Sequence, residues 1–130
     1  MDIRFLTIAG APPPPPTAAY SHVVRAGDFL FITGQLGVDP QTNALIEGGT
    51  EQQAKQIMRN LEVVVRGAGA TIDRAVMARI YLVNFAADYP AVNKVYASYF
   101  RDGVYPARTT VGVTNLALGA TVEIDLIVAL

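Results

Sequence analysis

The chain has 130 residues, about the size of one domain; 52% of them are hydrophobic and 16% are charged. This composition excludes an intrinsically disordered protein, which combines few apolar residues with many charges. The 10 Lys and Arg and 11 Asp and Glu give a net charge of -1, so no basic excess favours nucleic acid as a partner. The low share of charge also indicates that part of the surface is covered, most simply by another copy of the chain.

Two residue types that often carry chemistry are absent or nearly so: there is no cysteine, and His22 is the only histidine. A disulfide scaffold, a thiolate nucleophile and a cysteine-ligated zinc site are excluded, and a Ser-His-Asp triad or a two-histidine metal site is disfavoured. Any chemistry must therefore use Arg, Lys, Asp, Glu, Tyr, Ser or Thr side chains and water. No apolar run approaches a membrane span, and the stretch Phe5 to Ala11 is too short for a signal peptide, so a soluble, cytoplasmic protein is expected.

Five consecutive prolines, Pro12 to Pro16, favour an extended polyproline II segment without backbone donors. Such a segment is either a ligand for a proline-recognising module or a stiff leader, and the leader is the simpler interpretation. We predict a proline-rich arm at residues 1–17 and a single domain at residues 18–130.

The first half of the domain predicts two strands and one helix. Strand-like runs at 22–25 and 29–36 flank the tight turn Ala26-Gly27-Asp28. Thr50-Glu51-Gln52-Gln53 reads as a capping box, which begins an amphipathic helix of about 18 residues. Its apolar residues recur at helical spacing: Ala54, Ile57, Met58, Leu61, Val64, Val65 and Ala68. Gly67 and Gly69 mark its end.

The second half predicts a strand at 76–85, a helix from Asp88 to near Gly103, and strands at 107–114 and 121–130. The order strand, strand, helix, strand, helix, strand, strand indicates an α+β sandwich with two helices against one sheet. Helices on one side leave the other face of the sheet open, although its central strands are apolar on both faces. Self-association is the simplest way to cover that face.

Alternation along the strand at 107–114 places Arg108, Thr110 and Gly112 on one face. Along the strand at 121–130 it places Glu123 and Asp125 on the face opposite the apolar residues, and the two polar faces coincide if the strands pair. If these strands pair, Arg108 lies near both carboxylates, and a cleft there would suit a small carboxylate substrate. The simpler alternative is that Arg108 only forms an ion pair with Glu123 or Asp125. A metal bound by the two acids would need more oxygen ligands than this face offers.

Other polar and aromatic residues have simple structural interpretations. Tyr20 is expected as a half-buried anchor whose hydroxyl meets the backbone, and Asn93 as a solvated or capping amide. His22 is expected as a strand-edge side chain rather than a catalyst. Tyr96 and Tyr99 of the second helix are expected in the core.

The residues around Arg108 and Glu123 resemble a known family. Pro106-Ala107-Arg108-Thr109-Thr110-Val111, followed by Leu116 and Val122-Glu123-Ile124, looks like the C-terminal signature of the RidA/YjgF family. These proteins are reactive intermediate (enamine/imine) deaminases, also labelled L-PSP endoribonucleases. The resemblance continues through Phe31-Ile32-Thr33-Gly34-Gln35 and Val92-Asn93-Lys94-Val95-Tyr96, and it covers residues 20–130.

The resemblance implies a fold like that of chorismate mutase: one mixed β-sheet with two helices on one face, in homotrimers whose sheets form a central barrel with three clefts between subunits. It implies that Arg108 clamps a substrate carboxylate and that Glu123 orients water, without a cofactor. The positions matching the rest of the pocket are Tyr20, Thr33, Gly34, Asn93 and Thr110.

Four residues, at three places in the chain, depart from the family pattern. Thr110 stands where many members have a cysteine, Ala18-Ala19 where Gly-Pro is common, and Ala117 where a proline usually follows the leucine. These changes alter the rim of the pocket and leave Arg108 and Glu123 in place.

The leading hypothesis is a homotrimeric deaminase of small 2-imino acids of the 2-aminoacrylate or 2-iminopropionate type. It requires Arg108 and Glu123 to share a pocket walled by neighbouring copies. Two alternatives are a deaminase of a larger unsaturated amino acid such as 2-aminomuconate, and a trimer that binds a carboxylate metabolite or a partner without catalysis. Ribonuclease activity is disfavoured by the net charge and the single histidine, and chorismate mutase activity rests on fold similarity alone.

Overall fold

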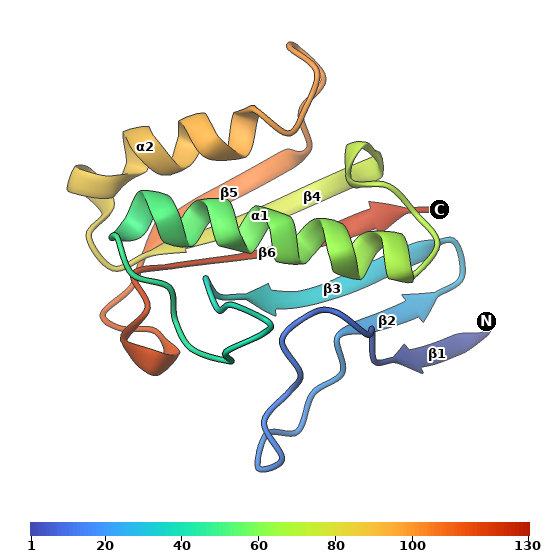
Figure 1. The fold of residues 1–130 in the computed structure, drawn as a ribbon. Helices are drawn as coiled ribbons and strands as arrows, with labels where there is room; N and C mark the ends of the chain where they lie inside the picture. Colours follow the sequence, from blue (N-terminus) through green and yellow to red (C-terminus); the bar gives the residue numbers. More distant parts are fainter.

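The computed structural model describes residues 1–130, which form one six-stranded mixed sheet with two helices on one face (Figure 1). The α+β class is thus confirmed. The elements in chain order are β1 (Ile3–Leu6), β2 (Val23–Ala26), β3 (Phe29–Gln35), α1 (Thr50–Gly67), β4 (Ala75–Leu82), α2 (Phe85–Ala97), β5 (Ala107–Gly112) and β6 (Val122–Ala129). Neither helix is long and apolar enough to cross a membrane.

The strands are arranged in the order β1-β2-β3-β6-β4-β5. β4 and β5 are parallel and are joined through α2, whereas the other neighbouring pairs are antiparallel. The last strand, β6, therefore returns to the middle of the sheet, between β3 and β4. Its residues Val122, Ile124, Leu126 and Val128 are at most 1% exposed, so β6 supplies the centre of the core beneath the helices.

Helix α1 has the 18 residues that the hydrophobic spacing predicts. The predicted apolar positions from Ala54 to Val65 are all fully buried against the sheet. A buried amide, Asn60, donates hydrogen bonds to the backbone carbonyls of Leu36 at 3.3 Å and Val38 at 2.9 Å. This contact fixes the segment that follows β3 against the helix.

The predicted capping box at the start of α1 is wrong. The N-cap residue is Gly49, and no side chain caps the helix. The Thr50 hydroxyl instead donates to Asp88 of α2 and contacts the Thr121 hydroxyl, each at 2.7 Å, while Gln53 accepts from the Thr121 backbone N–H at 3.0 Å. The hydrogen-bonding groups that would cap an isolated helix are used here to join α1 to α2 and to the start of β6.

Helix α2 begins at Phe85 and ends at Ala97, whereas the sequence predicted a start at Asp88 and an end near Gly103. Pro90 therefore lies in its second turn. The Asp88 backbone N–H already bonds to the Asn84 carbonyl at 3.0 Å, which shows that the helix is established before the proline. Proline removes one N–H donor without preventing this start, because only the carbonyl four residues earlier loses its partner.

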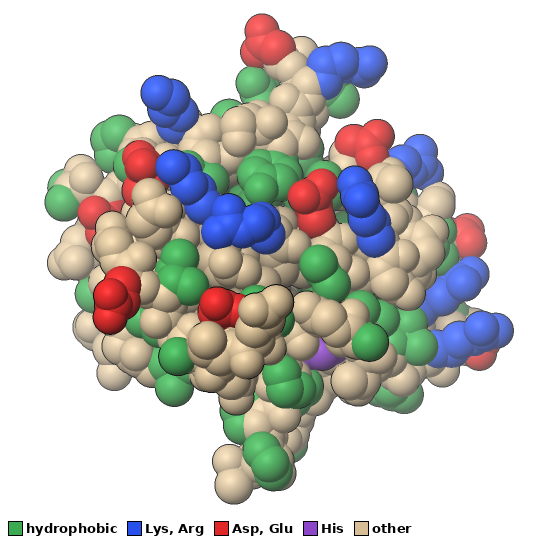
Figure 2. All heavy atoms as spheres, in the orientation of Figure 1, with side chains coloured by type: hydrophobic (Ala, Val, Ile, Leu, Met, Phe, Trp, Pro, Cys, Tyr) green, Lys and Arg blue, Asp and Glu red, His purple; other side chains and the backbone are tan.

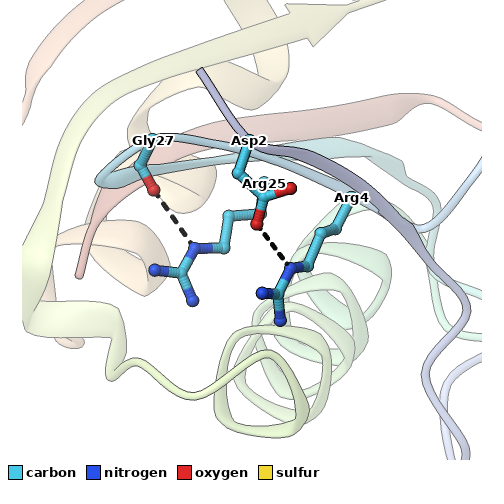
Figure 3. A network of polar contacts seen from close by, with 4 residues as sticks. All are labelled: Asp2, Arg4, Arg25 and Gly27. Atoms are coloured by element: carbon cyan, nitrogen blue, oxygen red, sulfur yellow. Dashed lines mark hydrogen bonds and ion pairs between the residues drawn. The ribbon is translucent and has the colours of Figure 1, made fainter.

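Strand β1 is an element that the sequence analysis did not assign. It pairs with β2 at the edge of the sheet, and the segment between these strands projects beyond the sheet (Figure 1). On this edge Arg4 lies directly opposite Arg25, a like-charge pair that is unfavourable. Asp2 accepts from Arg4 at 2.8 Å, and Arg25 donates to the Gly27 carbonyl at 3.1 Å (Figure 3). Each guanidinium thus has its own acceptor.

His22 was predicted as a strand-edge side chain, but it is buried, with 1% exposure. Its Nδ1 accepts a hydrogen bond from the Ile8 N–H at 2.7 Å, and its Nε2 lies 2.8 Å from the Pro12 carbonyl oxygen. Because Nδ1 accepts, the ring carries its proton on Nε2 and donates to Pro12. Both nitrogens hold the backbone of the proline arm, and this pairing allows a polar ring to be buried.

The sheet face opposite the helices is uncovered within one chain, and its β1 and β3 part exposes large apolar side chains. Leu30 and Ile32 of β3 are buried under the helices, whereas Phe29 and Phe31 alternate to the other face and are 44% and 45% exposed. Phe5 of β1 is 72% exposed. The helix side differs, because Lys and Arg side chains lie across α1 (Figure 2). The open face is the surface that the sequence analysis expected another copy to cover.

Replacement of His22 tests the anchoring of the arm. His22→Leu leaves the Ile8 N–H and the Pro12 carbonyl without partners, so we expect the free energy of unfolding in urea to fall by about 2 to 4 kcal/mol. Asp2→Asn is the control, since it breaks only an exposed ion pair and should change that free energy by about 0.5 kcal/mol or less. Equal effects of the two substitutions would contradict the anchoring role.

Candidate active site

Glu123 lies in a cavity of about 470 Å³ that is bordered by β6, the end of β3 and the proline arm. Its lining residues are Pro12, Pro13, Pro15, Ala18, Tyr20, His22, Thr33, Gly34, Gln35, Leu36, Val38, Asn43, Ala117, Leu118 and Glu123. Four of the predicted site residues thus gather around one cavity: Tyr20, Thr33, Gly34 and Glu123.

A β-bulge shapes the wall next to Glu123. The pairing of β3 with β6 shifts between Ile32 and Gln35, which leaves Thr33 and Gly34 outside the regular ladder. Bulges of this kind re-aim side chains near functional sites. A Cβ atom on Gly34 would collide with the Glu123 carboxylate, so glycine at this position lets the carboxylate lie this close to the backbone.

The Glu123 carboxylate has no hydrogen-bond or ion-pair partner within the chain. Burial raises the pKa of Glu123 above its ordinary value, and the negative charge of Asp125 raises it further. Burial, followed by the charge of Glu123, also raises the pKa of the Tyr20 hydroxyl, so that hydroxyl stays protonated as a donor at neutral pH. The expected backbone contact of the Tyr20 hydroxyl is not formed. An unpaired, partly desolvated carboxylate of this kind can act as a base.

Arg108 lies in a second cavity, of about 300 Å³, between β5 and α2. Its Nη1 donates to Oδ1 of Asn93 and its Nη2 to the Tyr89 hydroxyl, both at 2.7 Å. The guanidinium carbon also lies 5.1 Å from the ring centre of Tyr96 and 5.6 Å from that of Tyr89. These contacts use two of the five N–H donors of arginine, and the others stay free for a carboxylate. Asn93 holds Arg108 and is neither a solvated nor a capping amide.

Two hydroxyls on the same side of the sheet as Arg108 are buried without partners, those of Thr110 and Tyr96. Thr110 is directly opposite Ile80 of β4, which faces the helices. Burial raises the pKa of Tyr96 to about 12, against the smaller opposing effect of the Arg108 charge. Tyr96 therefore stays neutral and belongs to the core, as predicted.

The prediction that Arg108 lies near Glu123 and Asp125 through direct strand pairing is wrong for one chain. β4 separates β5 from β6, and Arg108 faces the helices while Glu123 lines the cavity on the other side of the sheet. The carboxylate of Asp125 instead accepts from Nε of Arg79 at 2.8 Å and from the Tyr81 hydroxyl at 3.2 Å. Both partners come from the intervening strand.

Sequence reasoning missed two residues that set this arrangement, Tyr89 and Arg79. Tyr89 lies one helical turn before Asn93, so the i, i+4 spacing could have indicated that both reach Arg108. Arg79 could not be found in this way, because its contact with Asp125 depends on which strands are neighbours. No three of the His, Asp and Glu side chains gather in a way that could hold a metal ion.

Comparisons with known proteins identify the family. The family model described as Endoribonuclease L-PSP matches residues 11–130. The chain belongs to the RidA/YjgF/L-PSP family. The resemblance carried by the residues around Arg108 and Glu123 is thereby confirmed, and the match extends upstream to include the five prolines.

Individual Rid-family proteins are similar over nearly the whole length. A RutC family protein of Aquifex aeolicus is 40% identical over 115 residues, which cover 88% of this chain and 90% of that protein. A Dermatophagoides farinae protein named 2-iminobutanoate/2-iminopropanoate deaminase is 37% identical over 117 residues, 90% of each chain. The crystal structure of a Rid-family protein from Yersinia pestis matches with a TM-score of 0.92 and 32% identity, covering 99% of this chain and 100% of that one. The family thus includes an imine deaminase.

The raised pKa of Glu123 predicts a pH-dependent stability difference. The folded chain favours the protonated carboxyl, so the stability from this group is complete below its ordinary pKa and is lost as pH rises through the raised pKa. Since Gln resembles the protonated form, we expect Glu123→Gln to unfold at a higher urea concentration than the wild type at pH 7 and at a similar one near pH 3.5. All urea unfolding curves are recorded at the same protein concentration, because association of folded chains makes the unfolding midpoint depend on concentration.

The control for this prediction is Glu47→Gln, which changes an exposed carboxylate outside the cavity. A rise in the urea midpoint of Glu123→Gln at pH 7 that persists unchanged near pH 3.5 would contradict the role of the buried charge. The same rise in Glu47→Gln would also contradict it.

Proposed function

We propose that this Rid-family chain is a cofactor-independent deaminase that hydrolyses 2-imino acids to 2-keto acids and ammonia. The observation that carries the proposal is the unpaired Glu123 carboxylate, with its raised pKa, in a cavity beside a β-bulge. The 37% identity to a named iminobutanoate/iminopropanoate deaminase supports the same chemistry. An acid without a structural partner is available to move protons.

The reaction needs only water, a base and orientation. Glu123 accepts a proton from water as the water oxygen bonds to the C=N carbon, and the imine nitrogen becomes an amine. Glu123 returns this proton to the nitrogen, which completes the –NH2 group of a carbinolamine. Glu123 then removes the hydroxyl proton and passes it to the same nitrogen. The C–O bond becomes C=O as the C–N bond breaks with its electron pair going to nitrogen, so ammonia and a 2-keto acid form. A positioned acid–base group of this type contributes about 10² to 10⁴ in rate. An enamine first tautomerises to the imine, which proceeds in water.

The substrate carboxylate requires a cation, and no Lys or Arg lines the Glu123 cavity. Arg108 of a neighbouring copy is the proposed partner. Three observations support this assembly: Arg108 and Glu123 occupy separate cavities in one chain, β5 is an edge strand, and the open sheet face exposes Phe5, Phe29 and Phe31. A homotrimer would cover this face and complete three sites, with the free donors of Arg108 binding the carboxylate in a bidentate way.

The remaining predicted site residues have proposed roles around this pair. Tyr20 and Thr33 offer hydroxyls beside Glu123, and Gly34 leaves room for its carboxylate. Asn93 orients the guanidinium, and the unpaired Thr110 hydroxyl lies on the same face of β5 as Arg108. Together they would hold the imine so that its C=N carbon meets the water.

Turnover of freshly generated 2-aminoacrylate and 2-iminopropionate is the direct test. We expect ammonia and keto acid to form faster than in buffer, and Glu123→Gln to lower kcat/KM by about 10² to 10⁴. Arg108→Lys should lose most of the activity because a point charge does not replace a planar fork of donors.

A folded oligomer that shows no rate above buffer overturns the proposal. If such an oligomer binds keto acids tightly in calorimetry, it is a non-catalytic binding protein instead. RNA cleavage that persists through further purification and in Arg108→Ala would favour the ribonuclease that the family description names.

Mixed oligomers test whether neighbouring copies share each site. Arg108→Ala and Glu123→Gln subunits are each expected to be nearly inactive alone, because every site lacks one of the two groups. When the two variants are co-expressed in equal amounts, about one site in four of a randomly mixed trimer has both native groups. We therefore expect up to about a quarter of wild-type activity to return.

The control mixes each variant with itself at the same total concentration. If each site used Arg108 and Glu123 of the same chain, the mixture would gain nothing over the separate variants. A monomer in light scattering would equally contradict shared sites.

A further inference from the structure

The cavity next to Glu123 extends along the proline arm. Pro12, Pro13 and Pro15 line one side of it, together with the apolar residues Leu36 and Leu118. The volume of about 470 Å³ falls within the range of sites that bind ligands larger than a three-carbon acid. A small imino acid at Glu123 would leave most of this space unfilled.

The arm side of the cavity is chemically suited to an uncharged, apolar group. Proline has no backbone N–H, so this wall offers rings and carbonyl oxygens and no backbone donors of its own. No Lys or Arg lines the cavity, Glu123 is negative, and both nitrogens of His22 are occupied by Ile8 and Pro12. A carboxylate would find no cation here, whereas a hydrocarbon side chain would lose contact with water at little cost.

The arm is held in place rather than free. His22 binds Ile8 and Pro12, Ala11 is buried, and the Ala18 N–H donates to the Pro15 carbonyl at 2.9 Å. The prolines between these anchors have restricted φ angles. The apolar wall therefore exists before a ligand arrives, and a preformed wall lowers the entropy cost of binding. In Figure 2 the projecting segment shows hydrophobic side chains at its surface.

We propose that this part of the cavity is a subsite for the substrate side chain, and that the enzyme prefers 2-imino acids with a branched aliphatic or aromatic side chain over 2-iminopropionate. The inference rests on the proposed deaminase function. The substrate carboxylate then points away from the arm, toward Arg108 of a neighbouring copy, and its apolar side chain packs against Pro13, Pro15 and Leu118. Each additional methylene buried there contributes roughly a fourfold gain in binding.

The experiment compares imines made in situ from alanine, leucine and phenylalanine by an L-amino acid oxidase, with imine consumption followed directly. We expect kcat/KM for the leucine or phenylalanine imine to exceed that for the alanine imine by about tenfold or more. Pro13→Trp fills the subsite and should lower this ratio about tenfold. Pro16→Trp is the matched control, since Pro16, like Pro13, is exposed but does not line the cavity, and it should keep the wild-type ratio.

Pro15→Trp narrows the same subsite from an independent position, in case Pro13→Trp fails to fold. If all imines are consumed with similar kcat/KM, or if the Pro13 and Pro15 variants keep the ratio as Pro16→Trp does, the subsite is wrong while the deaminase function stands. If a folded oligomer consumes no imine, the deaminase function is wrong and the subsite falls with it.

Discussion

The central position of β6 governs the arrangement of charge in this protein. β6 lies between β3 and β4, so it is buried on both edges and its apolar residues form the middle of the core. The same placement puts β4 between Glu123 and the edge strand that carries Arg108. One chain therefore presents an acid on one side of its sheet and a guanidinium on the other. Chemistry that needs both groups together requires more than one copy.

Two carboxylates on one face of β6 have separate roles because their neighbours differ. Asp125 is bound by Arg79 and Tyr81, which satisfy its charge within the sheet. Glu123, two residues earlier, lies opposite the bulge at Gly34 and has no partner. Burial and the nearby charge of Asp125 raise the pKa of Glu123. Two neighbouring acids in different environments, one bound by a cation and the other unpaired, are a common arrangement in acid–base sites.

The only histidine serves the structure. His22 is buried and uses both ring nitrogens to hold the backbone of the arm at Ile8 and Pro12. The proline segment therefore has a fixed place in the wall of the Glu123 cavity, and neither ring nitrogen of His22 is free. The open face of the sheet meets the end of the same arm, because Phe5 and Phe31 line one hollow together with Ala18 and Tyr20.

The sequence by itself determined the α+β class, the extent of α1 and the approximate bounds of β2 to β6. It also singled out Glu123 and Arg108 as the candidate site residues. These follow from periodicity and from a local signature, which depend on residues close together in the chain. Only the tertiary structure decided that Thr50 and Gln53 join elements instead of capping a helix, that His22 is buried, and that Arg108 and Glu123 lie apart. Each of these depends on which distant segments become neighbours, and strand order and side-chain pairing across a sheet have no local signature.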